Sequence, residues 1–193
     1  MMRVEPLSPS LLPAWRRLFE QSSCDCYCRY WHFEGTKNEW LDRCAHRPEE
    51  NAAEVPVATG LVALDGDDAI GWMKIAPRAS VPKLRRLPVY KSRDLGSDEG
   101  VLSIGCFLVH PSRRGHGVAR ALLEAAPAYA RSIGAVTLEA YPRRSEHRLA
   151  DEEAWMGQLG LFLAAGFQAV DSPSSAGAFD AYPVLRLAVQ VTV

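Results

Sequence analysis

The stretch from residue 101 to residue 134 shows three hydrophobic patterns in immediate succession. Residues 101–109 are mostly apolar and β-branched, which predicts a buried strand, and Gly105 inside this run indicates a local distortion. Pro111 ends the strand. After a short basic turn, apolar residues recur at the spacing of an amphipathic helix: Val118, Ala121, Leu122, Ala125, Ala126, Tyr129 and Ile133. The sequence therefore predicts a strand, a turn and a helix that begins at this turn.

Helical spacing also appears near the N-terminus. Apolar residues share one helical face over 10–20, where Ser8 or Ser10 can act as the cap. A second helix is predicted over 38–45, with three side chains facing inward: Trp40, Leu41 and Cys44. A late helix is predicted over 151–165 and ends at Gly166, a glycine suited to a C-cap. The segment 76–100 is Pro-rich and basic, which indicates a long connection.

Six further segments have the apolar or β-branched character of strands: 2–5, 58–64, 69–75, 135–141, 167–170 and 183–189. The turn Asp65-Gly66-Asp67-Asp68 predicts a hairpin between the second and the third of them. The segment that follows the central helix should lie parallel to the strand before that helix, as in a βαβ unit. The last two segments flank a Ser/Pro/Gly-rich turn, so we expect them to close the sheet as an antiparallel pair.

Composition is that of an ordinary globular protein. The chain has 193 residues, 48% of them hydrophobic and 23% charged, which favours a single domain over 1–193. Its 22 Lys and Arg against 23 Asp and Glu give a net charge of −1, which argues against nucleic acid or an anionic membrane as a partner. No signal-peptide pattern or membrane-length apolar run is present, so we expect a cytoplasmic protein with reduced cysteines.

The basic turn has the features of a phosphate-binding site. The first N–H groups of a helix lack intrahelical partners and carry the positive end of the helix dipole. Glycines let the backbone approach an anion, and the arginines at 113 and 114 add charge. Two familiar phosphate loops do not fit: no Lys follows Gly117 as a Walker loop needs, and Arg120 stands where the dinucleotide fingerprint needs glycine.

The turn does match the pattern Arg/Gln-x-x-Gly-x-Gly/Ala, in the sequence Arg114-Gly115-His116-Gly117-Val118-Ala119, between a strand and a long helix. In that setting the chain resembles the GNAT superfamily of acyl-CoA-dependent N-acyltransferases. The resemblance implies an α/β (α+β) fold with a mixed central sheet of six to seven strands, a splayed central parallel pair and about four flanking helices. The order of elements over most of the chain agrees with it. The sequence 161–167, in which the late helix ends at Gly-Phe, agrees with it as well.

The resemblance also implies acetyl-CoA as co-substrate and an amine as acceptor. Pyrophosphate would lie on the turn and the start of the helix, at Arg114, Gly115, His116, Gly117, Val118, Ala119 and Arg120. The pantetheine arm would pair with backbone at Phe107, Leu108 and Val109, and a strand N–H would polarise the thioester carbonyl. In this family the first two helices border the acceptor cleft. The N-terminal elaboration (20–57) is rich in Cys and aromatic residues. Its aromatic side chains either form part of the wall of that cleft or fill the core. The core is favoured, because aromatic residues contribute mostly through packing.

Two acid–base positions depart from the family's common pattern. Ser103 stands where members with a glutamate base often carry it, and Phe162 stands where a tyrosine acid is often found. Tyr141 and Glu139 are substitutes at the end of the parallel strand, two residues apart and thus on one side of the sheet. Tyr141 would protonate the leaving thiolate and Glu139 would accept the amine's proton through water. The alternatives are a core aromatic for Tyr141 and a partner of a neighbouring arginine for Glu139. Glu99, Glu153 and His110 are weaker candidates for the acid–base roles.

The cysteines suggest two other chemistries. Cys106 in the central strand is a conceivable acyl-cysteine nucleophile, although a buried cysteine without a visible base is usually inert. Cys24, Cys26, Cys28 and Cys44 lack the usual zinc spacing, so no metal is predicted. We therefore predict an N-acetyltransferase that acts on a small-molecule amine by direct attack, and a homodimer is compatible with this prediction. The rival hypotheses are a non-catalytic acyl-CoA-binding sensor and a zinc-dependent interaction module at 24–46.

Overall fold

The computed structural model describes residues 1–54, 59–91, 93–147, 149–150, 153–170 and 181–190. Over these residues the chain builds one seven-stranded sheet in the order β1-β2-β3-β4-β5-β7-β6. The strands are β1 (Met2–Pro6), β2 (Gly60–Asp65), β3 (Asp68–Pro77), β4 (Val101–Val109), β5 (Thr137–Ala140), β6 (Gln168–Ala169) and β7 (Leu185–Ala188). Among these seven described strands only β4 and β5 pair in parallel, so the predicted mixed sheet with a central parallel pair is confirmed.

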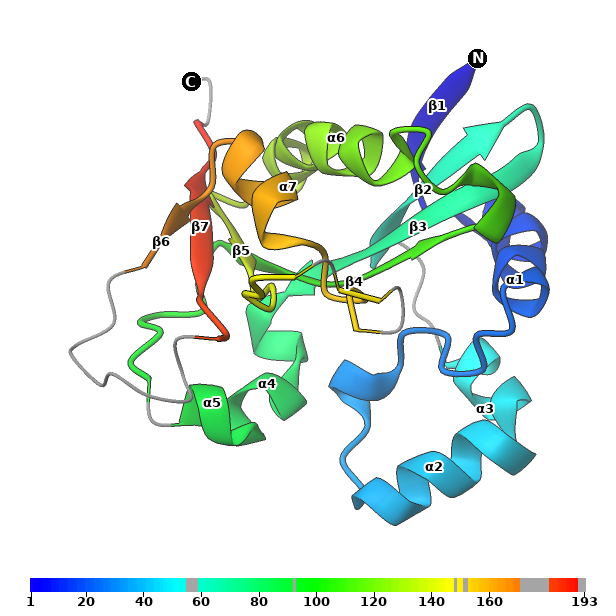
Figure 1. Ribbon diagram of the computed structural model, residues 1–193, viewed down its shortest axis with the longest axis horizontal. Coiled ribbons are helices and arrows are strands. Elements are labelled where there is room, and N and C mark those ends of the chain that lie inside the picture. Colours follow the sequence, from blue (N-terminus) through cyan, green and yellow to red (C-terminus); the bar gives the residue numbers. More distant parts are fainter. Residues whose placement is uncertain (55–58, 92, 148, 151–152, 171–180, 191–193) are drawn as a thin grey trace.

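Helices cover both faces of this sheet (Figure 1). The α-helices are α1 (Leu12–Gln21), α2 (Lys37–His46), α3 (Pro48–Ala53), α4 (Pro82–Arg86), α5 (Pro88–Lys91), α6 (Val118–Ser132) and α7 (Leu159–Ala164). Single 3₁₀ turns lie at Pro9–Leu11, Tyr30–His32, Arg78–Ser80 and Pro111–Arg113. None of the helices in the described part of the chain has the length and apolar character that a membrane crossing requires.

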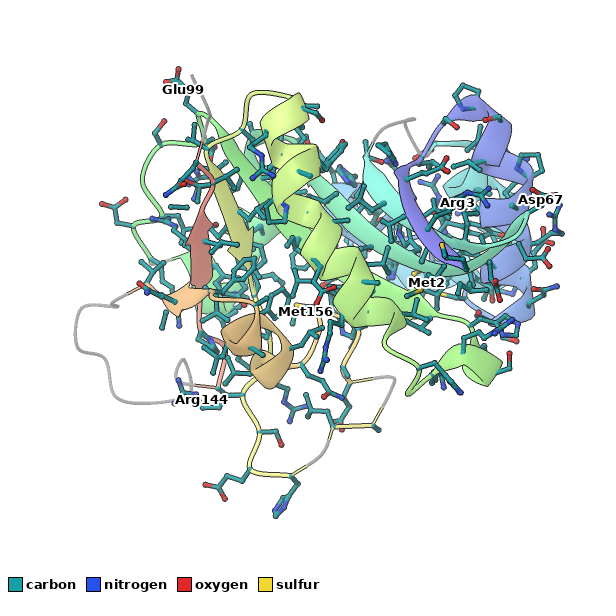
Figure 2. All side chains as sticks on the ribbon, turned by 90° about the horizontal axis from the view of Figure 1, so that it is seen from above. Met2, Arg3, Asp67, Glu99, Arg144 and Met156 are labelled. Atoms are coloured by element: carbon teal, nitrogen blue, oxygen red, sulfur yellow. The ribbon has the colours of Figure 1, made fainter. Side chains whose placement is uncertain are left out.

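Strand β2 shows why both faces are covered. Leu61 and Ala63 pack with α6 and the C-terminal elements, whereas Val62 and Leu64 pack with α1 on the other face. All four are at most 2% exposed, because successive side chains of a strand point to opposite faces. Figure 2 shows α6 lying across the sheet on the first of these faces. The sheet is therefore a middle layer with a core on each side.

The parallel pair is splayed, as predicted. β4 pairs with β5 only from Val101 to Ile104, opposite Thr137 to Ala140, and then continues to Val109 without it. The register of β4 against β3 shifts between Lys74 and Ile75, at the level of Gly105. This bulge bends β4 where the pair separates. A Cβ on Gly105 would lie 2.6 Å from Trp31 Nε1, so the glycine makes room for the Trp31 ring.

Three local predictions were wrong. The segment 76–100 contains α4 and α5, because Pro82 and Pro88 stand at helix starts, where a missing N–H costs nothing. The late helix begins at Leu159, because Gly157 with φ 88° breaks the pattern before it. Leu41 is 54% exposed, although its neighbour Trp40 is buried as expected. The first residue of the predicted strand 58–64, the first residue of the predicted helix 151–165 and the predicted turn over 171–180 lie outside the described residues.

Candidate active site

The turn before α6 has a backbone that few residues other than glycine can adopt. Gly115 and Gly117 have φ of 76° and 79°, and Gly117 is the N-cap of α6. No atom lies within 4 Å of a Cβ built on either glycine, so the left-handed backbone, not crowding, is what requires them. The turn is thus not part of an unbroken helix. Because the N-cap is a glycine, it has no side chain that could cap the helix, and the first N–H groups of α6 are left without an intrahelical partner.

Not every amide of the turn is available. The Arg114 N–H donates to Pro111 O and the His116 N–H donates to Arg113 O, each at 3.4 Å. The His116 ring folds back as well, with Nδ1 2.8 Å from the Arg114 carbonyl oxygen. The amides left for the predicted anion cradle are those of Gly115, Gly117, Val118, Ala119 and Arg120, a smaller set than the predicted 114–120.

The turn opens onto a cavity of about 1140 Å³. One end is lined by the turn and the start of α6, from Arg113 to Arg120 without His116. The middle is lined by β4 from Cys106 to Val109 and by residues near Trp155. The other end is lined by the N-terminal elaboration, with Ser22, Ser23, Cys24, Cys26, Tyr30 and Trp40. The volume and the concave shape suit a small-molecule ligand.

Past the splay, the edge of β4 faces this cavity. The Phe107 N–H donates to Trp155 O at 2.7 Å, so the loop before α7 already occupies that position. His110 N–H donates to Ile70 O on the β3 side, and N–H groups alternate along a strand, so Val109 N–H points away from β3 into the splay. The predicted edge is thus open at Val109 and closed at Phe107. Leu108 and Val109 line the cavity, as does Phe107.

Tyr141 and Glu139 belong to a buried ionic network. Tyr141 Oη donates to Glu139 Oε1 and lies 2.6 Å from both that oxygen and Ser103 Oγ. Glu139 is fully buried, and its Oε2 accepts from Arg78 Nη1 at 2.9 Å and from Arg186 Nε at 2.7 Å. Burial, and then the Glu139 charge, raises the pKa of Tyr141. Both side chains lie on one side of the sheet, as predicted, but neither is a lining residue of the cavity.

A model of the acetyltransferase (GNAT) family matches residues 15–151. The chain belongs to the GNAT acetyltransferase family. Among curated protein sequences none matches it significantly. Solved structures match it in fold at low identity. The GNAT domain of S. lividans PAT has a TM-score of 0.54 at 19% identity and covers 97% of this chain and 90% of that one.

Two of the solved structures contain the co-substrate or its product. YncA from Salmonella typhimurium, solved with its cofactor acetyl-CoA, has a TM-score of 0.52 at 14% identity, covering 98% of this chain and 94% of that one. PaiA from Thermoplasma acidophilum, in complex with coenzyme A, has a TM-score of 0.51 at 10% identity, covering 96% and 98%. At such identities the likeness extends to the fold alone. It agrees with the seven-stranded sheet and the splayed pair of this GNAT chain.

The N-terminal elaboration of this GNAT domain supplies both core and cavity wall. Trp31 is 2% exposed, and its Nε1–H donates to Gly105 O at 2.8 Å, so it belongs to the core. Tyr30 lines the cavity and packs edge-on against Trp40 and Trp155, with ring centroids at 5.7 and 5.9 Å. Trp155 falls within the helix that the sequence predicts over 151–165, but it lies before the helix start at Leu159. Its place in the cavity follows from a loop that local periodicity does not reveal.

The weaker candidates are peripheral. Glu99 is exposed and lies at the outer edge of the molecule (Figure 2). Glu153 is exposed and pairs with Arg143 Nη1 at 2.7 Å, and His110 bonds to Ser112 in the turn after β4. Among the described residues, no group of three or more His, Cys, Asp and Glu side chains is arranged to hold a metal ion. The zinc hypothesis for 24–46 therefore gains no support from these residues.

Proposed function

We propose that this protein is an N-acetyltransferase that transfers an acetyl group from acetyl-CoA to the amine of a small molecule by direct attack. One observation carries the proposal: the glycine turn at the start of α6 and the free edge of β4 open onto the same cavity. When bound, acetyl-CoA supplies the activated acetyl group as a thioester. Family membership and the likeness to GNAT structures that hold this cofactor support the assignment.

The residues present fit the cofactor at two points. The amides of Gly115, Gly117, Val118, Ala119 and Arg120 would hold the pyrophosphate, with the Arg114 and Arg120 side chains adding positive charge. The Val109 N–H would pair with the pantetheine arm in the manner of an added strand. The Phe107 N–H would polarise the thioester carbonyl only after the Trp155 carbonyl has left it. The proposal therefore requires the loop around Trp155 to move when the cofactor binds.

The acid–base roles of Tyr141 and Glu139 stay proposals. Burial raises the pKa of Tyr141, so the phenol keeps its proton, as a donor to the departing thiolate must. Glu139 is held by two arginines, which suits a structural anion better than a base. Because neither side chain lines the cavity, a proton would have to pass through intervening groups.

The acceptor end of the cavity favours an uncharged amine on an aromatic or apolar body. Tyr30, Trp40 and Trp155 provide flat apolar surface there. Of the described lining residues none is Asp, Glu or His, so no fixed anion would hold a second ammonium group and no carboxylate would deprotonate the first. We therefore propose a small monoamine, not a polyamine, as the acceptor.

Thioester loss with a panel of amines, including 2-phenylethylamine and spermidine, tests the activity. Calorimetric titration with coenzyme A tests the cradle in a matched pair of variants, Arg120→Glu at the start of α6 and Arg131→Glu in its last turn. We expect Arg120→Glu to weaken binding about tenfold or more, since a charge-assisted contact contributes more than 1 kcal/mol, while Arg131→Glu stays within about twofold. If the two variants bind coenzyme A with equal affinity, the proposed pyrophosphate site at the start of α6 is wrong. Tight coenzyme A binding without turnover of any amine would favour the non-catalytic sensor.

A further inference from the structure

Four of the five cysteines gather where the N-terminal elaboration meets β4. Cys28 Sγ and Cys106 Sγ are 2.9 Å apart, although 78 positions separate them in the sequence. Cys24 Sγ and Cys26 Sγ are 3.6 Å apart, and the Cys28 N–H points to Cys26 Sγ at 3.4 Å. All five thiols are free. The closest pair therefore joins two parts of the fold that are not neighbours in sequence.

The two thiols of this pair differ in access. Cys106 is 7% exposed and lines the cavity, whereas Cys28 is 3% exposed and lies behind it. Cys28 reaches this place through a turn in which Tyr27 and Cys28 have φ of 42° and 53°, a left-handed backbone that costs free energy for residues other than glycine. Of these two thiols, a small reagent in the cavity would thus meet Cys106 first and find Cys28 already in contact with it.

A buried cation lies beside the pair. Lys74 stands directly opposite Cys106 in the register of β3 and β4 and is 2% exposed. Burial lowers the pKa of Lys74 to about 8, so at neutral pH it remains mostly an ammonium, and its charge interacts with both thiols. A nearby cation favours the thiolate, which is the reactive form of cysteine. Burial raises the pKa of Cys28, so Cys28 is better suited to react second, after the other thiol has been oxidised, than to react first.

We propose that Cys28 and Cys106 form a peroxide-sensitive pair, which hydrogen peroxide arriving through the cavity converts to a disulfide. The Cys106 thiolate attacks one peroxide oxygen, an S–O bond forms as the O–O bond breaks, and the departing hydroxide takes the thiol proton to give water. The Cys28 thiolate then attacks that sulfur, and the S–O bond breaks as the S–S bond forms. The second hydroxide leaves as water with the Cys28 proton. Two thiols are oxidised, and one peroxide is reduced to two waters.

The product ties the wall that carries Cys24, Cys26 and Tyr30 to the edge of β4 and removes a thiol from the cavity. The inference does not depend on the proposed function. The full chain is treated with one equivalent of hydrogen peroxide, alkylated, and digested with trypsin. We expect the free thiols to fall from five to three and peptide 18–29 to become joined to peptide 94–113, and we expect dithiothreitol to reverse both changes.

Because Cys24, Cys26 and Cys28 share one tryptic peptide, a Cys24→Ser/Cys26→Ser double variant assigns the bond. It should still form the cross-link, as should the Cys44→Ser control, and Cys28→Ser should not. If Cys28→Ser fails to fold, the double variant and fragmentation of the wild-type cross-link decide the matter alone. A bond between Cys24 and Cys26, a cross-link between two chains, or five unreacted thiols would each overturn the proposal.

Discussion

The buried arginine that holds Glu139 offers the sharpest test of the fold around the site. The Arg78 side chain is fully buried and donates to Glu139, to Asp98 and to three carbonyl oxygens, those of Leu95, Gly96 and Ser97. Replacing it by Met removes the charge while keeping an apolar stem of similar length. Glu139 then depends on Arg186 and Tyr141. Leu95 O keeps the bond from Arg186 Nη2, whereas the Gly96 and Ser97 carbonyls lose the Arg78 donor.

Removing one partner of a buried ion pair costs about 3–5 kcal/mol. Since Arg186 remains with Glu139, we expect about 3 kcal/mol for Arg78→Met. For a chain of this size that corresponds to a fall in Tm of about 6–12 °C. Arg85→Ala is the matched control, because Arg85 pairs with the same Asp98 but is 48% exposed. An exposed pair contributes about 0–1 kcal/mol, so this variant should lose at most about 4 °C.

Urea unfolding and thermal melts followed by circular dichroism measure both values. Their pH dependence is a further check. Burial opposes ionisation of Asp98, but hydrogen bonds from Arg78 and Arg85 outweigh it, so the pKa of Asp98 lies below its ordinary value. Such a carboxylate stabilises the fold above its unfolded pKa of about 3.9 and ceases to do so as pH falls through the folded pKa. The gap between wild type and Arg78→Met should therefore narrow below about pH 4. A gap at pH 7 no larger than that of Arg85→Ala would refute the reasoning.

Three further outcomes are expected. Gly117→Ala and Gly134→Ala, at opposite ends of α6 with φ of 79° and 74° and open space around each, should both lose about 1 kcal/mol of stability in urea, but calorimetry should find weaker coenzyme A binding only for Gly117→Ala. The acid role of Tyr141 requires Tyr141→Phe to lower kcat much more than coenzyme A affinity; equal turnover would exclude it. Because no described lining residue is a carboxylate or imidazole, kcat/KM should rise with pH until the amine's own pKa and follow that pKa from one amine to another; a plateau fixed by the protein would point to a base.

The centre of the fold could be predicted from the sequence because its signals are local. The strand β4, the glycine turn and α6 each depend on residues that are adjacent in sequence, and the structure has all three. The start of α2 was equally readable. Thr36 and Glu39 form a capping box, whose Thr-x-x-Glu spacing would have placed the helix start before residue 38.

The surroundings of Glu139 could not be predicted, because they depend on pairing across the chain. Its partner Arg78 lies 61 positions earlier, in a segment that the sequence presented as a connection. A carboxylate at the end of a strand is equally consistent with a base in a cleft and with a buried anion. Only the tertiary contacts with Arg78 and Arg186 distinguish the two, and they favour the anion.

The same limit explains why the aromatic segment allowed two interpretations. Tyr30 and Trp31 are adjacent, yet one lines the cavity and the other fills the core against Gly105. The Trp31 ring fits only because Gly105 lacks a Cβ, and that glycine lies at the bulge where β4 leaves β5. The Trp31 ring of the N-terminal elaboration thus occupies the space beside Gly105, at the bulge that opens the edge of β4. Gly105→Ala should therefore displace Trp31. Because Trp31 is adjacent to Tyr30 and bonded to Gly105 O, this change should disturb the cavity lining at Tyr30 and the free edge of β4 together.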